Sequence, residues 1–216
     1  TLAELQAVVT TASKALDAAT ATAIAAAVTT LSSYDGTGTA PTTVSYADAG
    51  VTGVSGTNLA AVNNALATLG SAATDSTAEV QGIVDAYSAV LTGASGGTAP
   101  TLAQLQTLGI TGMTPANLAA LQAAIAATAN DGSGVDTLAE LQAVVTTASK
   151  ALDAATATAI AAAVTTLSSY DGTGTAPTTV SYADAGVTGV SGTNLAAVNN
   201  ALATLGSAAT DSTAEV

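Results

Sequence analysis

The residues best suited to chemistry lie in one oxygen-rich loop, "NDGSGVDTLAE", at residues 130–140. Calcium in proteins takes roughly six to eight oxygen ligands, and the millimolar calcium outside cells fills even weak sites. The loop therefore predicts a candidate calcium site, and calcium is the only cofactor that the sequence suggests. The candidate ligands are the side chains of Asp131, Ser133, Asp136 and Glu140 and the carbonyl group of Val135.

The same loop also has the pattern of a helix start. Asp136 and Thr137 are residue types that begin helices, and Glu140 completes a capping box, in which a hydroxyl and a carboxylate bond to exposed backbone amides. The loop lacks the full acidic spacing of an EF-hand, and the related "ATDSTAE" around Asp75 offers fewer oxygen ligands. A weak calcium site and a capped turn both remain open.

The composition excludes most catalytic chemistry. The chain has no cysteine, histidine or arginine, so it lacks a thiol nucleophile, an imidazole base and the usual ligands of soft metals. Asp131 and Asp136 would cleave glycosides as an acid and base only if burial shifted one of them, and a Gly-rich, polar loop does not suggest burial. We therefore predict no catalytic residues and no enzymatic activity.

The charge balance narrows the possible partners. The net charge is −13, and Lys14 and Lys150 are the only cationic side chains. This balance argues against binding nucleic acid and against a basic helix at a membrane surface. An isopeptide crosslink from either lysine would resemble the chemistry of β-sandwich surface proteins, whereas a lone lysine on a helix usually faces solvent.

The longest apolar stretch, "ATATAIAAAVTTLSS", occurs at residues 19–33 and again at 155–169. Threonines interrupt it, and Asp17 or Asp153 precedes it, so it falls short of the roughly 20 apolar residues of a membrane span. It predicts a buried helix, with no insertion of this segment into a membrane.

The chain repeats itself. Thr1–Val80 recurs without a change as Thr137–Val216, a shift of 136 positions. Within this unit, the sequence from Ala40 aligns without gaps on the sequence from Ala99, a shift of 59. Because both ends fall inside the pattern, we expect a window of a longer array, with any targeting signal outside it. The predicted segments are 1–39, the C-terminal part of a second module; 40–98, a first module; 99–175, a second module with a long final helix; and 176–216, a truncated first module.

Each module has the pattern of three helices. The first is short and ends at Gly50 or Gly109, where a glycine can cap a helix in the left-handed conformation. The second has apolar residues spaced three and four apart, and the third begins with a capping box at Ser76 or Thr137. The predicted apolar face of the first module's third helix consists of Val80, Ile83, Val84, Tyr87 and Leu91.

The final helix of the second module continues to Ser168, either as one helix or as two joined near residues 154–158. Its 32 residues from Thr137 would span about 48 Å, which suits a strut between modules. With aromatic residues at only 2% of the chain, the cores must consist of alanine, valine, leucine and isoleucine and be thin. The predicted fold class is all-α, a tandem array of three-helix bundles.

The segment "YADAGVTGVSGTNLAAVNNALA", from Tyr46, and "STAEVQGIVDAYSAVL", from Ser76, resemble repeat modules of very large secreted bacterial surface proteins, the adhesins and matrix proteins. Their plan is also similar to the GA module, a three-helix bundle with which some bacterial surface proteins hold serum albumin. The resemblance implies an extracellular or cell-surface location. Albumin binding would need an exposed apolar patch, and the second helices offer mainly alanine, asparagine, glutamine and threonine.

These observations predict a structural repeat region of an extracellular bacterial fibre, stalk or adhesin, whose partners are copies of itself. A unit repeated without change over 80 positions is suited to building length rather than to one specialised reaction. Two alternatives stay open: multivalent modules that bind a host or matrix protein, and a surface-layer protein. Ligand binding would need exposed anchors, and the only candidates, Tyr46 and Tyr182, lie on the inward pattern of a short helix.

Overall fold

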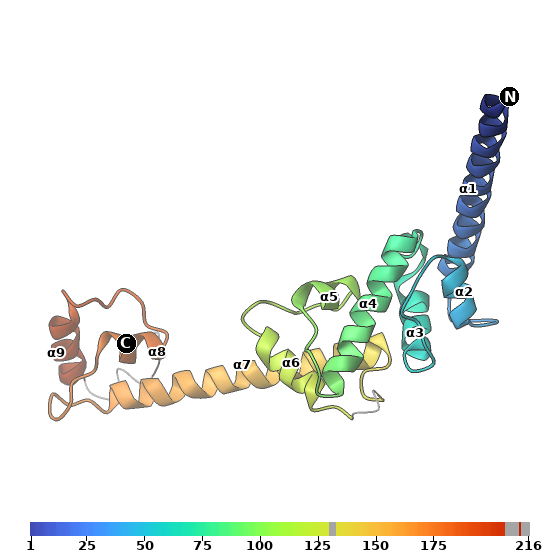
Figure 1. Ribbon diagram of the computed structural model, residues 1–216. Helices are drawn as coiled ribbons and strands as arrows, with labels where there is room; N and C mark the ends of the chain where they lie inside the picture. The colour runs from blue at the N-terminus through green and yellow to red at the C-terminus, as the bar shows by residue number, and fades with distance from the viewer. Residues whose placement is uncertain (130–132, 206–211, 213–216) are drawn as a thin grey trace. The chain divides into compact units, whose positions relative to one another are not determined.

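The computed structural model describes residues 1–129, 133–205 and 212 (Figure 1). The regular structure of these residues is entirely helical and contains no strand, which confirms the all-α class. In chain order the helices are α1 (Leu2–Ser32), α2 (Thr43–Asp48), α3 (Leu59–Leu69), the short 3-10 helix η1 (Ser71–Ala73), α4 (Thr77–Ala94), α5 (Leu102–Thr107), α6 (Leu118–Ala126), α7 (Leu138–Ser168), α8 (Thr179–Asp184) and α9 (Leu195–Leu205).

The chain forms two compact units, Thr1–Ser149 and Lys150–Val216, which we call unit 1 and unit 2. The boundary falls inside α7, so the start of this helix belongs to unit 1 and its remainder to unit 2. α7 is one continuous helix of 31 residues, which decides between the two arrangements that the sequence allowed. The division of the sequence into four segments remains a prediction.

The turn after each short helix forms as the glycine pattern predicts. Gly50 has φ +74° and Gly109 has φ +71°, a conformation that costs residues with a Cβ atom free energy. The next backbone N–H reaches back across the turn, from Val51 to the Tyr46 carbonyl at 2.9 Å and from Ile110 to the Leu105 carbonyl at 3.2 Å. Both apolar residues are buried, so each turn closes the end of its helix against the core.

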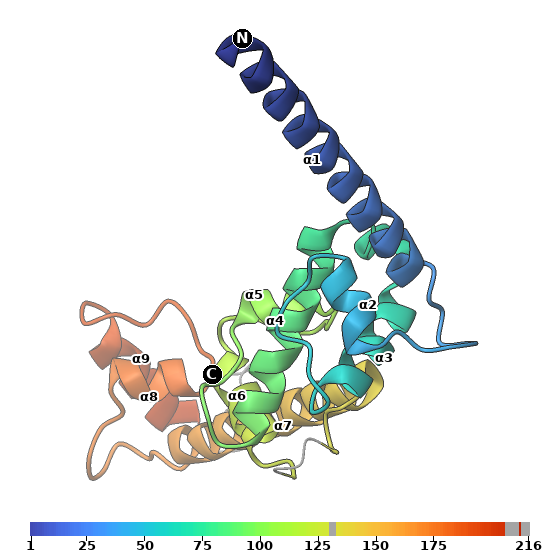
Figure 2. The same ribbon diagram turned by 45° about the vertical axis from the view of Figure 1, so that its right-hand side comes forward.

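Unit 1 has one continuous core built around α4. This helix packs on α3, which precedes it, and on α5 and α6, which follow it (Figure 2). Of the five residues predicted on the inward face of α4, four are buried and Leu91 is partly buried. The buried four are Val80, Ile83, Val84 and Tyr87. The start of α7 joins the same core through Leu138, Leu141 and Val145.

Unit 2 has a much smaller core, although its sequence copies part of unit 1. Its buried residues are Val164, Leu167, Tyr182, Ala185 and Leu202, the copies of Val28, Leu31, Tyr46, Ala49 and Leu66. The described part of unit 2 contains no equivalent of α4. Among the described residues of unit 2, the end of α7 packs with α8 and α9.

The expectation of a buried helix at residues 19–33 is wrong in one respect. The segment is helical, but only Val28 and Leu31 in it are buried, with Ile24 and Ala27 partly covered. One stripe of α1 packs against α2 and η1, and the other faces carry alanine and threonine to solvent. The threonine hydroxyls bond to carbonyl oxygens one turn back, as Thr29 does to Ala25 at 2.9 Å, so the exposed helix satisfies them itself.

Candidate functional site

A pair of hydrogen bonds joins the Gly-Val-Thr turn of residues 50–52 to α4. The Thr52 N–H donates to Gln81 Oε1 at 2.8 Å, and Gln81 Nε2 donates to the Thr52 carbonyl at 3.1 Å. One side-chain amide thus satisfies both backbone groups of a single turn residue, much as a neighbouring strand would. The paired bonds fix the position of α4 along its axis.

The turn after α5 and the start of α7 repeat this contact with different residues around it. The Thr111 N–H donates to Gln142 Oε1 at 2.9 Å, and Gln142 Nε2 donates to the Thr111 carbonyl at 3.1 Å. We call this pairing of a turn threonine with a helix glutamine the docking clamp. It recurs although the turn reads Gly-Val-Thr in one module and Gly-Ile-Thr in the other.

A second bond accompanies each docking clamp, two helical turns further on. Asn58 Nδ2 donates to Ser88 Oγ at 3.1 Å, and Asn117 Nδ2 donates to Ser149 Oγ at 3.4 Å. The sequence analysis missed both contacts. The signal was present as a glutamine followed seven residues later by a serine, at Gln81 and Ser88 and again at Gln142 and Ser149.

A buried asparagine links α3 to α2 and to the segment before α2. Tyr46 donates its hydroxyl to Asn63 Oδ1 at 2.6 Å, and Asn63 Nδ2 donates to the Pro41 carbonyl at 2.9 Å. Unit 2 repeats the arrangement. The Tyr182 hydroxyl donates to Asn199 Oδ1 at 2.7 Å, and Asn199 Nδ2 donates to the Pro177 carbonyl at 2.9 Å. In α6, Gln122 is the counterpart of Asn63 and makes only the proline bond, to the Pro100 carbonyl at 2.9 Å, because Leu105 stands in the place of the tyrosine.

The buried tyrosines are structural. Tyr46 and Tyr182 are fully buried, which confirms that they face inward and removes them as anchors for a ligand. Burial raises the pKa of Tyr46 and the pKa of Tyr182, since a phenolate would lose its hydration. Tyr87 is also fully buried, and its hydroxyl has no hydrogen-bond partner in the part of the chain that the structure describes.

We expect Tyr46→Phe and Tyr87→Phe to change the free energy of unfolding by different amounts or in opposite directions. Removing the Tyr46 hydroxyl leaves Asn63 Oδ1 without its donor, so stability should fall by about 1–2 kcal/mol. Removing the unpaired Tyr87 hydroxyl should change stability by less than about 0.5 kcal/mol or raise it. Urea unfolding followed by circular dichroism measures both, and equal losses for the two variants would contradict the hydrogen-bond assignment.

The candidate calcium ligands are only partly brought together. Asp131 lies outside the described residues, and the Val135 side chain is fully buried in the core of unit 1. Glu140 Oε2 accepts bonds from the Thr137 N–H at 3.1 Å and from the Thr137 hydroxyl at 2.8 Å, and Thr137 Oγ1 accepts from the Glu140 N–H at 3.2 Å. These bonds confirm the predicted capping box. Hydrogen bonds from Asp136 and then Thr137 lower the pKa of Glu140.

The calcium site itself stays a prediction. The Glu140 carboxylate accepts hydrogen bonds at the start of α7. Ser133 and Asp136 are the other described residues among the candidate calcium ligands with polar side chains. Among the residues that the structure describes, no three acidic side chains lie close enough together to hold a metal ion. The capping box accounts for the bonds between Thr137 and Glu140, and Glu140 also has a hydrogen bond with Asp136.

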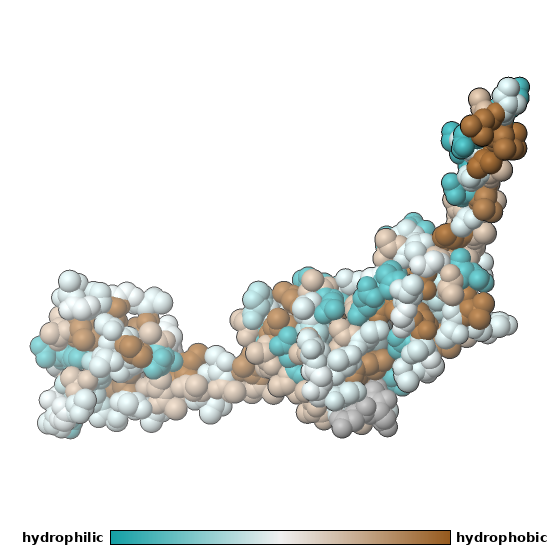
Figure 3. All heavy atoms as spheres, viewed as in Figure 1, coloured by the Kyte–Doolittle hydropathy of each residue, from teal (hydrophilic) through white to brown (hydrophobic). Residues whose placement is uncertain are grey.

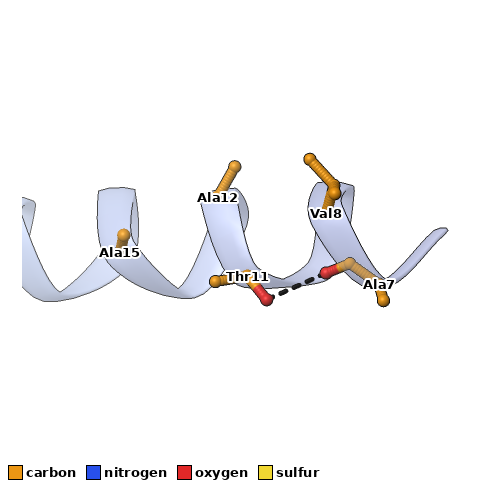
Figure 4. A pocket seen from close by; sticks show the side chains of 5 residues that line it. All are labelled: Ala7, Val8, Thr11, Ala12 and Ala15. Atoms are coloured by element: carbon orange, nitrogen blue, oxygen red, sulfur yellow. Dashed lines mark hydrogen bonds between the residues drawn. The ribbon is translucent and has the colours of Figure 1, made fainter. Parts of the chain in front are cut away.

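Two of the surface hollows that the described residues form lie along α1 and at its end. One lies against the exposed start of α1 and is lined by alanine, valine and threonine from a single helix face (Figure 4). Another, at the end of α1, includes Tyr34 and Asp35. A hydrogen bond from the Thr37 hydroxyl lowers the pKa of Asp35, and the Thr37 N–H also donates to Asp35 Oδ1, so the carboxylate is part of a turn.

No family model matches the chain, and neither does any curated protein or solved structure. The contacts within the chain and its internal repeats therefore carry the functional argument.

Two helices, α1 and α7, are long and apolar enough to cross a membrane by length and composition alone. This is weak support for a membrane span, because core helices and signal sequences have the same properties. Each of the two helices carries a lysine and an aspartate near its middle, Lys14 with Asp17 and Lys150 with Asp153. Charged side chains at that depth in a bilayer are costly.

Proposed function

We propose that the chain is a structural repeat region of an extracellular bacterial fibre, stalk or adhesin. In this proposal each module is a three-helix bundle, and tandem modules extend a filament by packing on one another. The observation that carries the proposal is the continuity of the unit 1 core through α4, which packs on α3 of its own module and on α5 and α6 of the next.

Polar contacts between the modules support the same proposal. The Leu138 N–H, at the start of α7, donates to Asn64 Oδ1 in α3 at 3.0 Å. A Cβ atom built on Gly109 would lie 3.1 Å from Leu69 Cδ2, so the turn of the second module sits close against α3. A chain in which modules share apolar and polar contacts couples their stability, as in other repeat proteins.

The composition of the surface also supports a structural role. Only 8% of the residues are charged, whereas free soluble proteins normally keep many charges outside. Binding a protein ligand would need aromatic or charged anchors, and the described tyrosines are buried or half-buried. In this proposal the filament lies outside the cell, as the sequence resemblance to secreted bacterial surface proteins implies, and this segment neither binds nucleic acid nor inserts into a membrane.

Arrays of one, two and three 136-residue units would test the proposal. Electron microscopy of dilute samples should show particles whose length grows by the same increment with each unit, because each unit packs in the same way on the one before. Unfolding midpoints should rise with the first added unit and then level off. Particles of unchanged length, or units that unfold independently of their number, would contradict the proposed filament.

A further inference from the structure

α7 has one face that stays exposed along most of the helix. The residues of this face follow a spacing of three and four positions, so they fall on one side of the helix. We call them the strut face: Ala143, Thr146, Thr147, Lys150, Asp153, Ala154, Ala157 and Ala161. Alanine and threonine are neither strongly apolar nor strongly polar, so the exposed length of α7 is mostly pale (Figure 3).

The strut face is exposed even where neighbouring helices are in place. At the start of α7, Leu141 and Val145 pack in the unit 1 core while Ala143 and Thr146 stay exposed on another side of the helix. The same sequence recurs in α1, which α2, α3 and α4 follow, and there the copies of the strut face, within residues 7–25, are exposed as well. Neither the helices before this sequence nor those after it therefore cover the strut face.

The two lysines of the chain lie at the middle of this face. Lys150 is one helical turn from Asp153 in α7, and Lys14 and Asp17 repeat the arrangement in α1. All four side chains are exposed, and none of them has an ion pair or hydrogen bond among the described residues. In a chain of net charge −13, each cationic side chain thus stands beside a carboxylate with which it is not paired.

We propose that the strut face of α7 binds the strut face of a second copy of this chain, with the two helices antiparallel. The inference rests on the proposed function, because it names the surface through which neighbouring filaments would join. When the helix is turned end to end, its order of charges reverses. A twofold axis between residues 151 and 152 therefore pairs Lys150 of each copy with Asp153 of the other.

This register brings small side chains opposite each other. Thr146 lies opposite Ala157 of the second copy, because the two positions are equally far from the axis. Such small residues let the helix axes approach to about 8 Å, the short end of the usual range. The Thr146 hydroxyl donates to the Gln142 carbonyl of its own helix at 2.8 Å, so its proton is already bonded when the contact forms.

The charges also select the antiparallel orientation. Parallel helices in register would place Lys150 opposite Lys150 and Asp153 opposite Asp153, and like charges at close range disfavour a contact. Exposed ion pairs are weak, so we expect a Kd of about 0.1–1 mM for one contact between single chains. Arrays of several units carry one strut face for each unit and should bind more tightly through multivalency.

Disulfide trapping tests the register in the intact chain, which has no cysteine of its own. Thr146→Cys and Ala157→Cys are prepared as separate variants at exposed positions, and circular dichroism checks that each keeps its helix content. Under mild oxidation an equimolar mixture should form mixed dimers at least about 10-fold faster than either variant dimerises alone. The reason is that two copies of residue 146, or of residue 157, would lie roughly 16 Å apart along the helices, too far for a disulfide.

The rates of dimerisation decide between the possible arrangements. Equal rates in the mixture and in the single variants would contradict the register. Faster dimerisation of each single variant would indicate parallel helices. Either result overturns the proposal.

Charge variants test the ion pairs, with both strut faces changed in each variant. The acidic variant carries Lys14→Glu and Lys150→Glu, and the basic variant carries Asp17→Lys and Asp153→Lys. Sedimentation velocity from about 10 µM to about 1 mM measures self-association, which should be visible for the unchanged chain. Each variant alone should associate at least about 10-fold more weakly, because its pairs become repulsive.

The basic variant and a mixture separate specific pairing from net charge. The basic variant is less negative than the unchanged chain, so general repulsion alone would make it associate more tightly. An equimolar mixture of the acidic and basic variants should regain association, since every facing pair is then of opposite sign. Ala19→Glu with Ala155→Glu is the control on another exposed face of the same helices and should weaken association less than the acidic variant does.

Three results of these measurements would overturn the proposal. The first is the mass of one chain over the whole concentration range. The second is tighter association of the basic variant than of the unchanged chain. The third is binding of the single chain to phosphatidylcholine vesicles without self-association, which would assign the strut face to a membrane surface.

Arrays of the 136-residue unit separate this inference from the proposed function. Arrays that lengthen by a fixed increment but give no mixed disulfides would reject the strut contact and leave the proposed filament standing. Mixed disulfides at the predicted positions in arrays that do not lengthen would support the strut contact and reject the filament.

Discussion

Replacing Leu141 with alanine should lower the free energy of unfolding of unit 1 by about 2–5 kcal/mol, the range for leucines removed from a packed core. Leu141 is fully buried where the start of α7 meets the unit 1 core. Gln142, the next residue of α7, is held in the docking clamp, so we expect the helix to stay in place around the space that Leu141 leaves. Urea unfolding followed by circular dichroism, at a few µM protein, measures the loss.

The same chain provides the control for this prediction. Leu5 has the same neighbours in sequence as Leu141 but is 62% exposed. Leu5→Ala should change the stability of the dilute chain by less than about 0.5 kcal/mol, as is usual for surface sites. Equal losses of stability in Leu5→Ala and Leu141→Ala would show that the start of α7 does not pack in the unit 1 core and would contradict this prediction.

The second large effect is expected at Asn63. Asn63→Leu keeps the branching and the number of side-chain heavy atoms but removes the bonds to the Tyr46 hydroxyl and to the Pro41 carbonyl. Because both partners lose their hydrogen bond in a buried or half-buried setting, stability should fall by about 2–4 kcal/mol. The segment before α2 should also lose its attachment to α3, which proteolysis after Pro41 would detect.

A double variant checks the cause of this loss. In Asn63→Leu with Tyr46→Phe the unpaired hydroxyl is gone, so the double variant should be less destabilised than the sum of the two single variants by about 1 kcal/mol or more. Strict additivity would show that the tyrosine and the asparagine do not act as a pair in solution.

Local sequence patterns predicted much of the fold of unit 1. Apolar spacing gave the inward face of α4, and the two turn glycines marked the ends of α2 and α5. The capping pattern predicted the helix starts at Ser76 and Thr137, where the reciprocal bonds are present. These features depend on residues close together in the chain, so a single sequence contains them.

The rest depends on neighbours distant in sequence. The docking clamp joins Thr52 to a residue 29 positions away, and nothing near Thr52 specifies that partner. Leu5 and Leu141 have identical surroundings in sequence but opposite burial, so no local pattern could distinguish them. The burial of residues 19–33 was overestimated for the same reason, because helix amphipathicity indicates a face without showing whether anything covers it.

The starts of α1 and α7 have the same sequence, so they allow a direct test of one claim. The claim is that contacts with neighbouring helices, rather than the local sequence, stabilise the start of α7. Residues 2–13 and 138–149 have the same sequence and hence the same intrinsic amide exchange rates, and an acid protease releases peptides of equal mass from both. In hydrogen exchange of the dilute chain, this peptide should show two isotopic envelopes of equal intensity. The slow envelope comes from α7 and should exchange at least about 100-fold more slowly than the exposed start of α1. A single envelope throughout the exchange would contradict the account.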